Sequence, residues 1–266
     1  MKRRRLLAFV GWLAAALVLT VGFGFIQAVS PVTAQQQTPL TVSAAVSLTN
    51  ALQEIKTLYQ RSKPNVNITY NFGASGALQQ QIEQGAPVDV FFSAASKQID
   101  ALQQKNLLVP GTRRNLLTNR LVLITPRNGS TLSSFTDLSR SQVKRIAIGE
   151  PRSVPAGQYA QELLTNLKIF DALKPKFVYG NNVRQVLTFV ETGNADAGIV
   201  YATDAKQSNS VRVGTTASAS LYSPIVYPIA VLKDSKNVGA AKDFVQFLSG
   251  SQARGVFQKH GFGTAR

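Results

Sequence analysis

Four segments of the sequence place small or hydroxyl-bearing residues directly after an apolar run and directly before a helical pattern. Two of them contain Ser47 and Ser75, and the other two contain Ala156 and Val183. The first turn of a helix carries backbone N–H groups without an intrahelical acceptor, and the helix dipole adds positive potential there. Such termini bind anions, and serine hydroxyls add further donors. The four segments therefore predict a site for one small oxyanion held by N–H and O–H groups.

Each of these segments also has a plainer interpretation when it is taken alone. A serine before a helix is often only an N-cap, and Pro155 in front of Ala156 is a common way to begin a helix. Tyr201 ends an apolar run, where it could offer a phenolic donor to the same anion or simply pack in the core. The residues by themselves leave both interpretations open.

The elements that would position these residues form an alternating pattern. Strand-like apolar runs alternate with amphipathic helical segments, and the predicted strands are 40–45, 66–72, 88–94, 121–125, 145–149, 176–179, 197–201 and 225–232. Several runs are apolar throughout, as in strands that helices cover on both faces. The pattern predicts an α/β fold with mainly parallel sheets flanked by helices. In such folds ligands lie beyond the carboxyl ends of the strands, where the four segments fall.

Two polar stretches, 111–120 and 213–223, are predicted to be crossings between two lobes. Lobe 1 would then consist of residues 38–117 and 224–266, and lobe 2 of residues 118–223. This organisation places a cleft between the lobes. Two of the four segments would come from each lobe and meet around a single anion.

The composition excludes several classes of function. The 266 residues contain no cysteine and one histidine, so disulfides, thiol catalysis, cysteine-based metal sites and a lipid-bearing cysteine are not available. The formal net charge is +16, and a charge of this sign can indicate nucleic-acid binding. Beyond residue 34 no basic run exceeds a pair such as Arg113-Arg114. We therefore predict no nucleic-acid partner and interpret the charge as a dispersed, solvated surface.

Residues 1–34 have the pattern of a secretory signal peptide. A basic start, residues 2–5, precedes the uncharged apolar run 6–26, and Val32-Thr33-Ala34 fits a cleavage signal. The apolar run is also long enough to span a bilayer, so a membrane anchor that stays uncleaved is an alternative. Both interpretations predict a periplasmic or other extracytoplasmic location for the folded part.

Over essentially the whole chain after the predicted signal peptide, the sequence resembles the molybdate-binding proteins of ABC importers, which are periplasmic type II solute-binding proteins. The resemblance rests on six segments in a fixed order, namely 44–50, 81–91, 154–160, 182–184, 198–205 and 261–262. It implies a two-lobed type II periplasmic-binding-protein fold with the ligand between the lobes. It also implies capture of molybdate, with tungstate as a second ligand, because the two anions are nearly equal in size and charge.

The same resemblance implies a ligand set and partners. Molybdate oxygens would be held by Ser47 and Ser75 from lobe 1 and by Ala156, Val183 and Tyr201 from lobe 2. Molybdenum would be bound only as its oxyanion through these residues, with no other metal and no cofactor. The implied partner is the membrane permease of an ABC importer with a separate ATPase, and the protein itself is expected to be a monomer.

Two other functions compete with this one. A receptor for another tetrahedral oxyanion such as sulfate would need the same donors, whereas a phosphate site usually needs a carboxylate acceptor and only Glu150 lies near the segments. A secreted serine hydrolase would need His260, and Ser75 is followed directly by Gly76, which differs from the Gly-x-Ser-x-Gly nucleophile motif. The sequence therefore predicts a binding protein rather than an enzyme.

Overall fold

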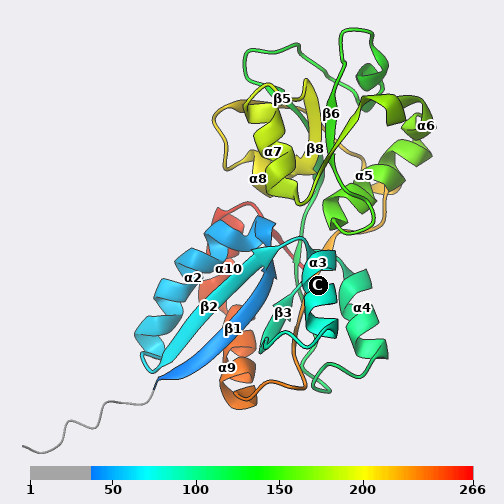
Figure 1. The fold of residues 1–266 in the computed structure, drawn as a ribbon. Coiled ribbons are helices and arrows are strands. Elements are labelled where there is room, and N and C mark those ends of the chain that lie inside the picture. The colour runs from blue at the N-terminus through cyan, green and yellow to red at the C-terminus, as the bar shows by residue number, and fades with distance from the viewer. Residues whose placement is uncertain (1–36, 266) are drawn as a thin grey trace, which may run out of the picture. The chain divides into compact units, whose positions relative to one another are not determined.

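A computed structural model describes residues 37–265, which form two β-sheets flanked by helices (Figure 1). The first sheet, here lobe 1 with its helices, contains β1 (Thr38–Ala45), β2 (Val66–Gly73), β3 (Val90–Phe92), β4 (Arg114–Thr118), β10 (Val226–Val231) and β11 (Gly263–Thr264). Its strand order is β11-β4-β10-β3-β1-β2. The predicted signal peptide lies outside the described residues. No helix within residues 37–265 is long and apolar enough to cross a membrane.

The second sheet, lobe 2 with its helices, comes from one continuous stretch of chain. It contains β5 (Leu121–Pro126), β6 (Ile146–Gly149), β7 (Phe177–Gly180), β8 (Ala197–Tyr201) and β9 (Val211–Thr216) in the order β7-β6-β8-β5-β9. The α/β architecture predicted from the sequence is thus confirmed. Each sheet is mixed: β1 pairs in parallel with β2 and β3, and β6 with β7 and β8, whereas β10 and β5 are antiparallel to their neighbours.

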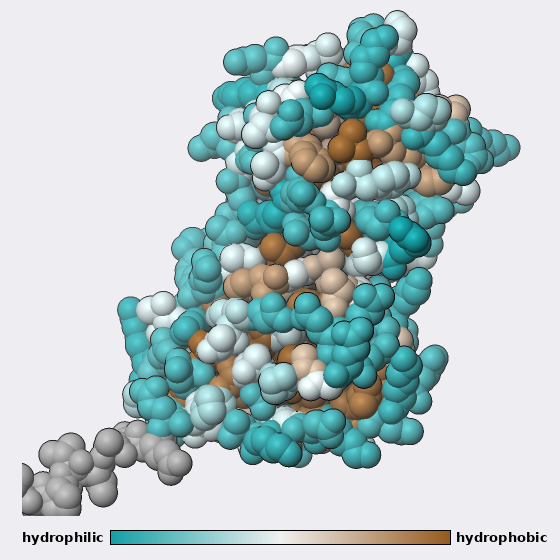
Figure 2. All heavy atoms as spheres, in the orientation of Figure 1, coloured by the Kyte–Doolittle hydropathy of each residue, from teal (hydrophilic) through white to brown (hydrophobic). Residues whose placement is uncertain are grey.

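Helices cover both sheets. In lobe 1 they are η1 (Val46–Leu48), α2 (Thr49–Ser62), α3 (Ser75–Glu83), α4 (Ser96–Gln104), α9 (Val238–Leu248) and α10 (Ser251–Lys259). In lobe 2 they are η2 (Phe135–Ser139), α5 (Pro155–Asn166), α6 (Phe170–Leu173), η3 (Lys174–Lys176), α7 (Val183–Glu191), α8 (Ala202–Ala205) and η4 (Ala219–Leu221). The apolar stripe of α7 is fully buried, as its helical spacing predicts. Figure 2 shows that hydrophilic side chains cover most of the visible face, with small scattered apolar patches.

The chain passes between the sheets at two places, and these are shorter than the sequence predicts. Much of the polar stretch 111–120 is strand β4, and the Ser/Thr-rich stretch 213–223 begins inside β9. The first crossing is therefore residues 119–120 alone. Both strands carry many exposed polar residues, so they lack the apolar run from which the other strands were predicted. These segments form strands because they pair with neighbouring strands, which their own composition does not indicate.

Candidate anion-binding site

All five residues predicted to bind the ligand line one small cavity to which both lobes contribute. Ser47 and Ser75 come from lobe 1, and Ala156, Val183 and Tyr201 come from lobe 2. The other lining residues are Ala45, Val46, Gly73, Ala74, Ala94, Val154 and Pro155. The space open to the centre of a water molecule is only about 10 Å³, which is close to the room for one water. The cavity therefore suits a ligand of very few atoms, and no charged residue lines it.

The five residues meet because each stands at the carboxyl end of a strand. Ser47 follows β1, Ser75 follows β2, and Tyr201 is the last residue of β8. Ala156 and Val183 lie in the first turns of α5 and α7, which follow β6 and β7. Strands β1 and β2 run parallel, as do β6, β7 and β8, so these ends lie at one edge of each sheet. This is the edge at which α/β folds bind ligands.

The two serines do not act as helix caps. Ser75 is the first residue of α3. The N-cap of this helix is Ala74, and no side chain makes a capping hydrogen bond there. The N-cap of α2 is Leu48, again without a side-chain bond. Instead, the Ser75 hydroxyl accepts a hydrogen bond of 2.9 Å from the backbone N–H of Ala94, and Ser47 Oγ lies 3.0 Å from Tyr227 Oη. The plainer interpretation of both serines is therefore wrong.

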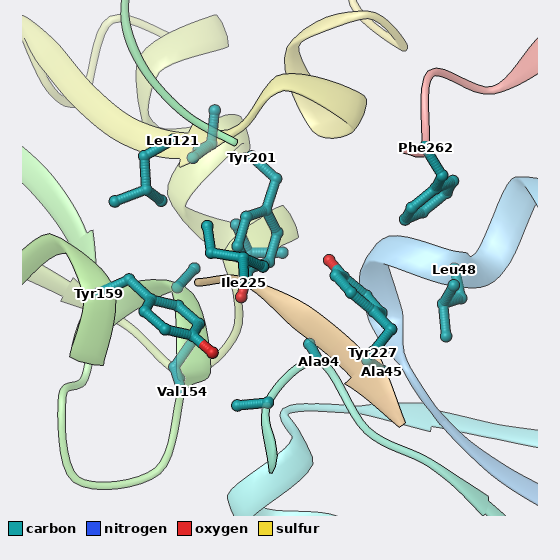
Figure 3. Close-up of a cluster of buried hydrophobic side chains, with 14 of the residues drawn as sticks. Ala45, Leu48, Ala94, Leu121, Val154, Tyr159, Tyr201, Ile225, Tyr227 and Phe262 are labelled. Carbon is teal, nitrogen blue, oxygen red and sulfur yellow. The ribbon is translucent and has the colours of Figure 1, made fainter. Parts of the chain in front are cut away.

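The Tyr201 hydroxyl is buried and has no hydrogen-bond partner among residues 37–265. The residue is 1 % exposed, and the centroid of its ring lies 5.9 Å from that of Tyr227. Figure 3 shows the two side chains beside each other. Burial raises the pKa of Tyr201 well above its ordinary value, so the hydroxyl keeps its proton. An unpaired buried polar group destabilises a protein by about 1–3 kcal/mol. At the cavity, this hydroxyl is free to donate to a ligand.

Ala156 and Val183 can offer only their backbone N–H groups. Ala156 is the second residue of α5, and no side chain caps that helix. In α7 the side chain of Asn182 accepts from the N–H of Gln185, which leaves the N–H of Val183 in the first turn. A Cβ on Gly157 would overlap the carbonyl of Gly149 at the end of β6. This glycine lets α5 pack directly on the strand and so sets where its N-terminus lies.

Two hydrogen bonds join the loops of the two lobes beside the cavity. The backbone N–H of Gly76 donates to the carbonyl oxygen of Ser153 at 3.0 Å, and Arg184 Nη2 donates to Asn50 Oδ1 at 2.9 Å. Gly76 closely approaches the backbone of Ser153 in the other lobe. A Cβ on Gly73 would meet the side chain of Leu78. The structure therefore contains the closed arrangement of the two lobes.

Comparison with known proteins agrees with this geometry. The bacterial extracellular solute-binding protein family matches residues 40–263. The ModA molybdate-binding protein of Haemophilus influenzae is 36% identical over 254 residues, which cover 93% of this chain and 95% of that protein. This chain is a bacterial extracellular solute-binding protein of the ModA type. YvgL of Bacillus subtilis, a lipoprotein assigned to ABC transporter substrate binding, is 45% identical over 86% of this chain and 87% of its own length.

A solved structure extends the likeness to three dimensions. The periplasmic molybdate-binding protein of Azotobacter vinelandii superposes with a TM-score of 0.78 at 26% identity, covering 85% of this chain and all of that one. The solute-binding protein therefore has the two-lobed type II fold that the sequence predicts. It is the substrate-binding component of an ABC transporter and not an enzyme.

The charged residues near the cavity of the solute-binding protein are neutralised by one another. Arg184 Nε lies 2.7 Å from Asp204 Oδ1, and Asp204 is completely buried. Burial raises the pKa of Asp204 to about 6, while the Arg184 guanidinium opposes that rise. Arg152 is 89 % exposed and pairs with Glu150 at 3.2 Å. A ligand would therefore meet neutral donors rather than a formal positive charge.

The residues that a hydrolase would need are not brought together. His260 Nε2 lies 3.0 Å from Glu54 Oε2 at the end of α10, and the Ser75 hydroxyl contacts the Ala94 backbone instead. In the part of the chain that the structure describes, no group of three or more histidine, cysteine, aspartate or glutamate residues could hold a metal ion.

Two residues that contact the predicted serines escaped the sequence analysis. Tyr227 contacts Ser47, and Ala94 contacts Ser75. Tyr227 and Ala94 lie within predicted strands, where they are indistinguishable from ordinary core residues. Only the pairing of β10 beside β3 brings them to the same edge as the serines.

Proposed function

We propose that this solute-binding protein captures molybdate, MoO₄²⁻, and delivers it to the permease of its ABC transporter. The observation that carries the proposal is the lining of the cavity. Three hydroxyls and two helix-terminal N–H groups converge on a space for a ligand of very few atoms. One of those hydroxyls, Tyr201, has no hydrogen-bond partner within residues 37–265. The ModA relatives support molybdate as the anion.

A dianion can be buried in this cavity only if every oxygen receives hydrogen bonds. Transfer of an unpaired charge out of water is prohibitive, whereas hydrogen bonds to ionised groups are short and strong. Donors from both lobes meet this need after the lobes close, so binding and hinge closure are coupled. Ser47 and Ser75 receive the anion first from lobe 1 in this scheme, and the donors of lobe 2 complete its coordination.

Charge and protonation restrict the ligand further. No carboxylate lines the cavity, and the nearest buried one, Asp204, is paired with Arg184. An anion that carries a proton would find no strong acceptor, which disfavours phosphate. Tungstate matches molybdate in charge and nearly in size and is proposed as a second ligand. Sulfate also lacks a proton, so only the size of the closed cavity separates it from molybdate.

The remaining features of the transport cycle are proposals as well. Residues 1–34 would export the chain, and the folded part would act as a monomer in the periplasm or outside the cell. A permease with a separate ATPase would accept the closed form. The lobe boundaries proposed are 38–117 with 224–266 for lobe 1 and 118–223 for lobe 2.

The test is calorimetric titration of the protein, expressed from its full chain, with molybdate, tungstate, sulfate and phosphate. We expect tight binding of the first two and weak binding of the others. The variants Ser47→Ala and Ser75→Ala should each weaken molybdate binding by about 1.5–3 kcal/mol, the value of a hydrogen bond to a charged group. Ser249→Ala is the matched control. The Ser249 hydroxyl, directly after α9, donates to the carbonyl oxygen of Val245 in that helix. Sulfate binding as tight as molybdate binding would refute the assignment.

A further inference from the structure

A chain of hydrogen bonds runs from the first crossing to a cavity-lining serine. Asn119 Nδ2 lies 3.1 Å from Tyr227 Oη, and Tyr227 Oη lies 3.0 Å from Ser47 Oγ. Asn119 Nδ2 also lies 2.9 Å from Thr203 Oγ1 in α8. The chain thus starts between the lobes, contacts both of them, and ends at the anion site.

Asn119 determines which groups donate and which accept in this series of hydrogen bonds. Its Oδ1 accepts a hydrogen bond of 2.9 Å from the backbone N–H of Arg120, and a backbone N–H can only donate. The other end of the amide is therefore the NH₂ group, which also can only donate. Tyr227 Oη and Thr203 Oγ1 are accordingly its acceptors.

The direction then passes through Tyr227 to Ser47. Tyr227 is 0 % exposed, and burial raises its pKa well above the ordinary value, so its hydroxyl is protonated. Because Tyr227 Oη already accepts from Asn119, its own proton needs an acceptor. Among residues 37–265, Ser47 Oγ is the other side-chain atom that has hydrogen-bond geometry with this hydroxyl, and Tyr201 Oη does not. A buried hydroxyl proton left without an acceptor is strongly disfavoured. Ser47 therefore accepts from Tyr227.

We infer that Tyr227 and Asn119 are positioning residues that make Ser47 a donor toward the bound anion, and that they thereby select against anions carrying a proton. This inference rests on the proposed function. Once Ser47 accepts from Tyr227, its own proton remains for an oxygen in the cavity. The N–H of Ala94 has the same effect on Ser75, so both serines of lobe 1 present protons. Tyr227 touches no ligand in this account and acts through Ser47.

The test compares two dianions of similar size that differ by one proton. Under mildly alkaline conditions phosphate is chiefly HPO₄²⁻, whereas sulfate is SO₄²⁻, and competition against molybdate measures both affinities. Tyr227→Phe keeps the ring but frees Ser47 to accept from a ligand. We expect molybdate affinity to fall about tenfold and the phosphate-to-sulfate affinity ratio to rise by about the same factor. A residue with only a packing role would leave that ratio unchanged.

A second variant reverses the direction of these hydrogen bonds instead of removing one of them. In Asn119→Asp the carboxylate accepts from Tyr227, Tyr227 then accepts from Ser47, and the Ser47 proton turns away from the cavity. The added charge weakens both dianions equally, so the ratio still isolates the proton. We expect it to rise at least as much as in Tyr227→Phe. Thr203→Val removes the other acceptor of Asn119 but leaves the chain intact, and it should keep the wild-type ratio.

Melting curves establish that each variant is folded before titration, and if Tyr227→Phe does not fold, Asn119→Asp carries the test. An unchanged phosphate-to-sulfate ratio in the folded variants would overturn the inference while leaving molybdate capture intact. A wild-type protein that binds no molybdate would overturn the proposed function, and titration of the unmodified protein shows that result separately.

Discussion

The backbone N–H of Gly76 donates a 3.0 Å hydrogen bond to the carbonyl oxygen of Ser153, and this bond joins the terminus of α3 in lobe 1 to the loop before α5 in lobe 2. The two loops carry Ser75 and Ala156, which line the anion cavity. A Cβ at position 76 would lie 2.5 Å from the Ser153 oxygen, which is closer than real contacts allow. The width of the closed cavity therefore depends on the absence of a side chain at this position.

Gly76→Ala should hinder closure without unfolding either lobe. We expect molybdate affinity to fall at least about tenfold, equivalent to 1.4 kcal/mol, because the loops can no longer meet. Calorimetry measures the affinity and thermal melting checks the fold. Gly255→Ala is the matched control, since a Cβ there meets open space inside α10, and it should bind normally with about 0.5–1 kcal/mol greater stability. Normal binding by Gly76→Ala would show that closure does not need this contact.

Tyr201→Phe should change binding and stability in opposite directions. Without ligand, the variant loses a buried hydroxyl that has no hydrogen-bond partner in the part of the chain that the structure describes. Its free energy of unfolding should therefore equal or exceed that of the wild type. With molybdate, it lacks one donor, and binding should weaken by about 1.5–3 kcal/mol. Denaturant unfolding of the free protein and titration with molybdate give the two quantities. A variant that is less stable and binds normally would mean that the hydroxyl serves the core.

Variants at the two ends of the contact between Arg184 and Asn50 distinguish an effect on lobe closure from an effect on folding. Asn50→Ala removes only the interlobe hydrogen bond of 2.9 Å, so we expect a several-fold loss of molybdate affinity, about 1 kcal/mol, and nearly unchanged stability. Arg184→Ala also leaves the buried Asp204 carboxylate unpaired and should destabilise the protein by about 3–5 kcal/mol. Urea unfolding of both variants distinguishes the two roles. Equal loss of stability in the two would contradict this division.

Asp204 should give the protein a specific dependence of stability on pH. Burial raises its pKa from 3.8 to about 6, so the folded protein binds this proton more tightly than the unfolded chain. The contribution of Asp204 to the free energy of unfolding therefore falls as pH rises from about 4 to 6, by about 3 kcal/mol in all, and is constant above that window. Asp204→Asn removes the effect. Urea titrations at several pH values would refute it if the two profiles ran parallel.

Much of the site was predictable because its signals are local. A small residue or serine between an apolar run and a helical pattern marks the carboxyl end of a strand, and four such segments converge in the structure together with Tyr201. The apolar stripe of α7 likewise reports its buried face directly. The resemblance to a known family implied which of these positions would contact the ligand. Local pattern and family together were enough to place Ser47, Ser75 and Tyr201 at one cavity.

What the sequence did not reveal depends on contacts between distant segments. Tyr227 lies 180 positions from Ser47, and nothing in its own strand distinguishes it from a core residue. The need for glycine at position 76 was also hidden, because the backbone that it approaches, Ser153, belongs to the other lobe. Strands β4 and β9 escaped notice because exposed strands carry polar residues. In each case tertiary pairing supplies information that local composition lacks.

The position of β10 has a consequence for how the chain folds. β10 lies inside the first sheet, between β3 and β4, although more than 100 residues, including all the strands of lobe 2, separate it from β4 along the chain. Lobe 2 is continuous and can fold as soon as its own residues are available, whereas lobe 1 stays divided into two strand groups until residue 231 arrives. Late, long-range pairing of this kind is slow. We therefore expect lobe 2 to assemble first and the anion site to form only after β10 has paired with β3 and β4.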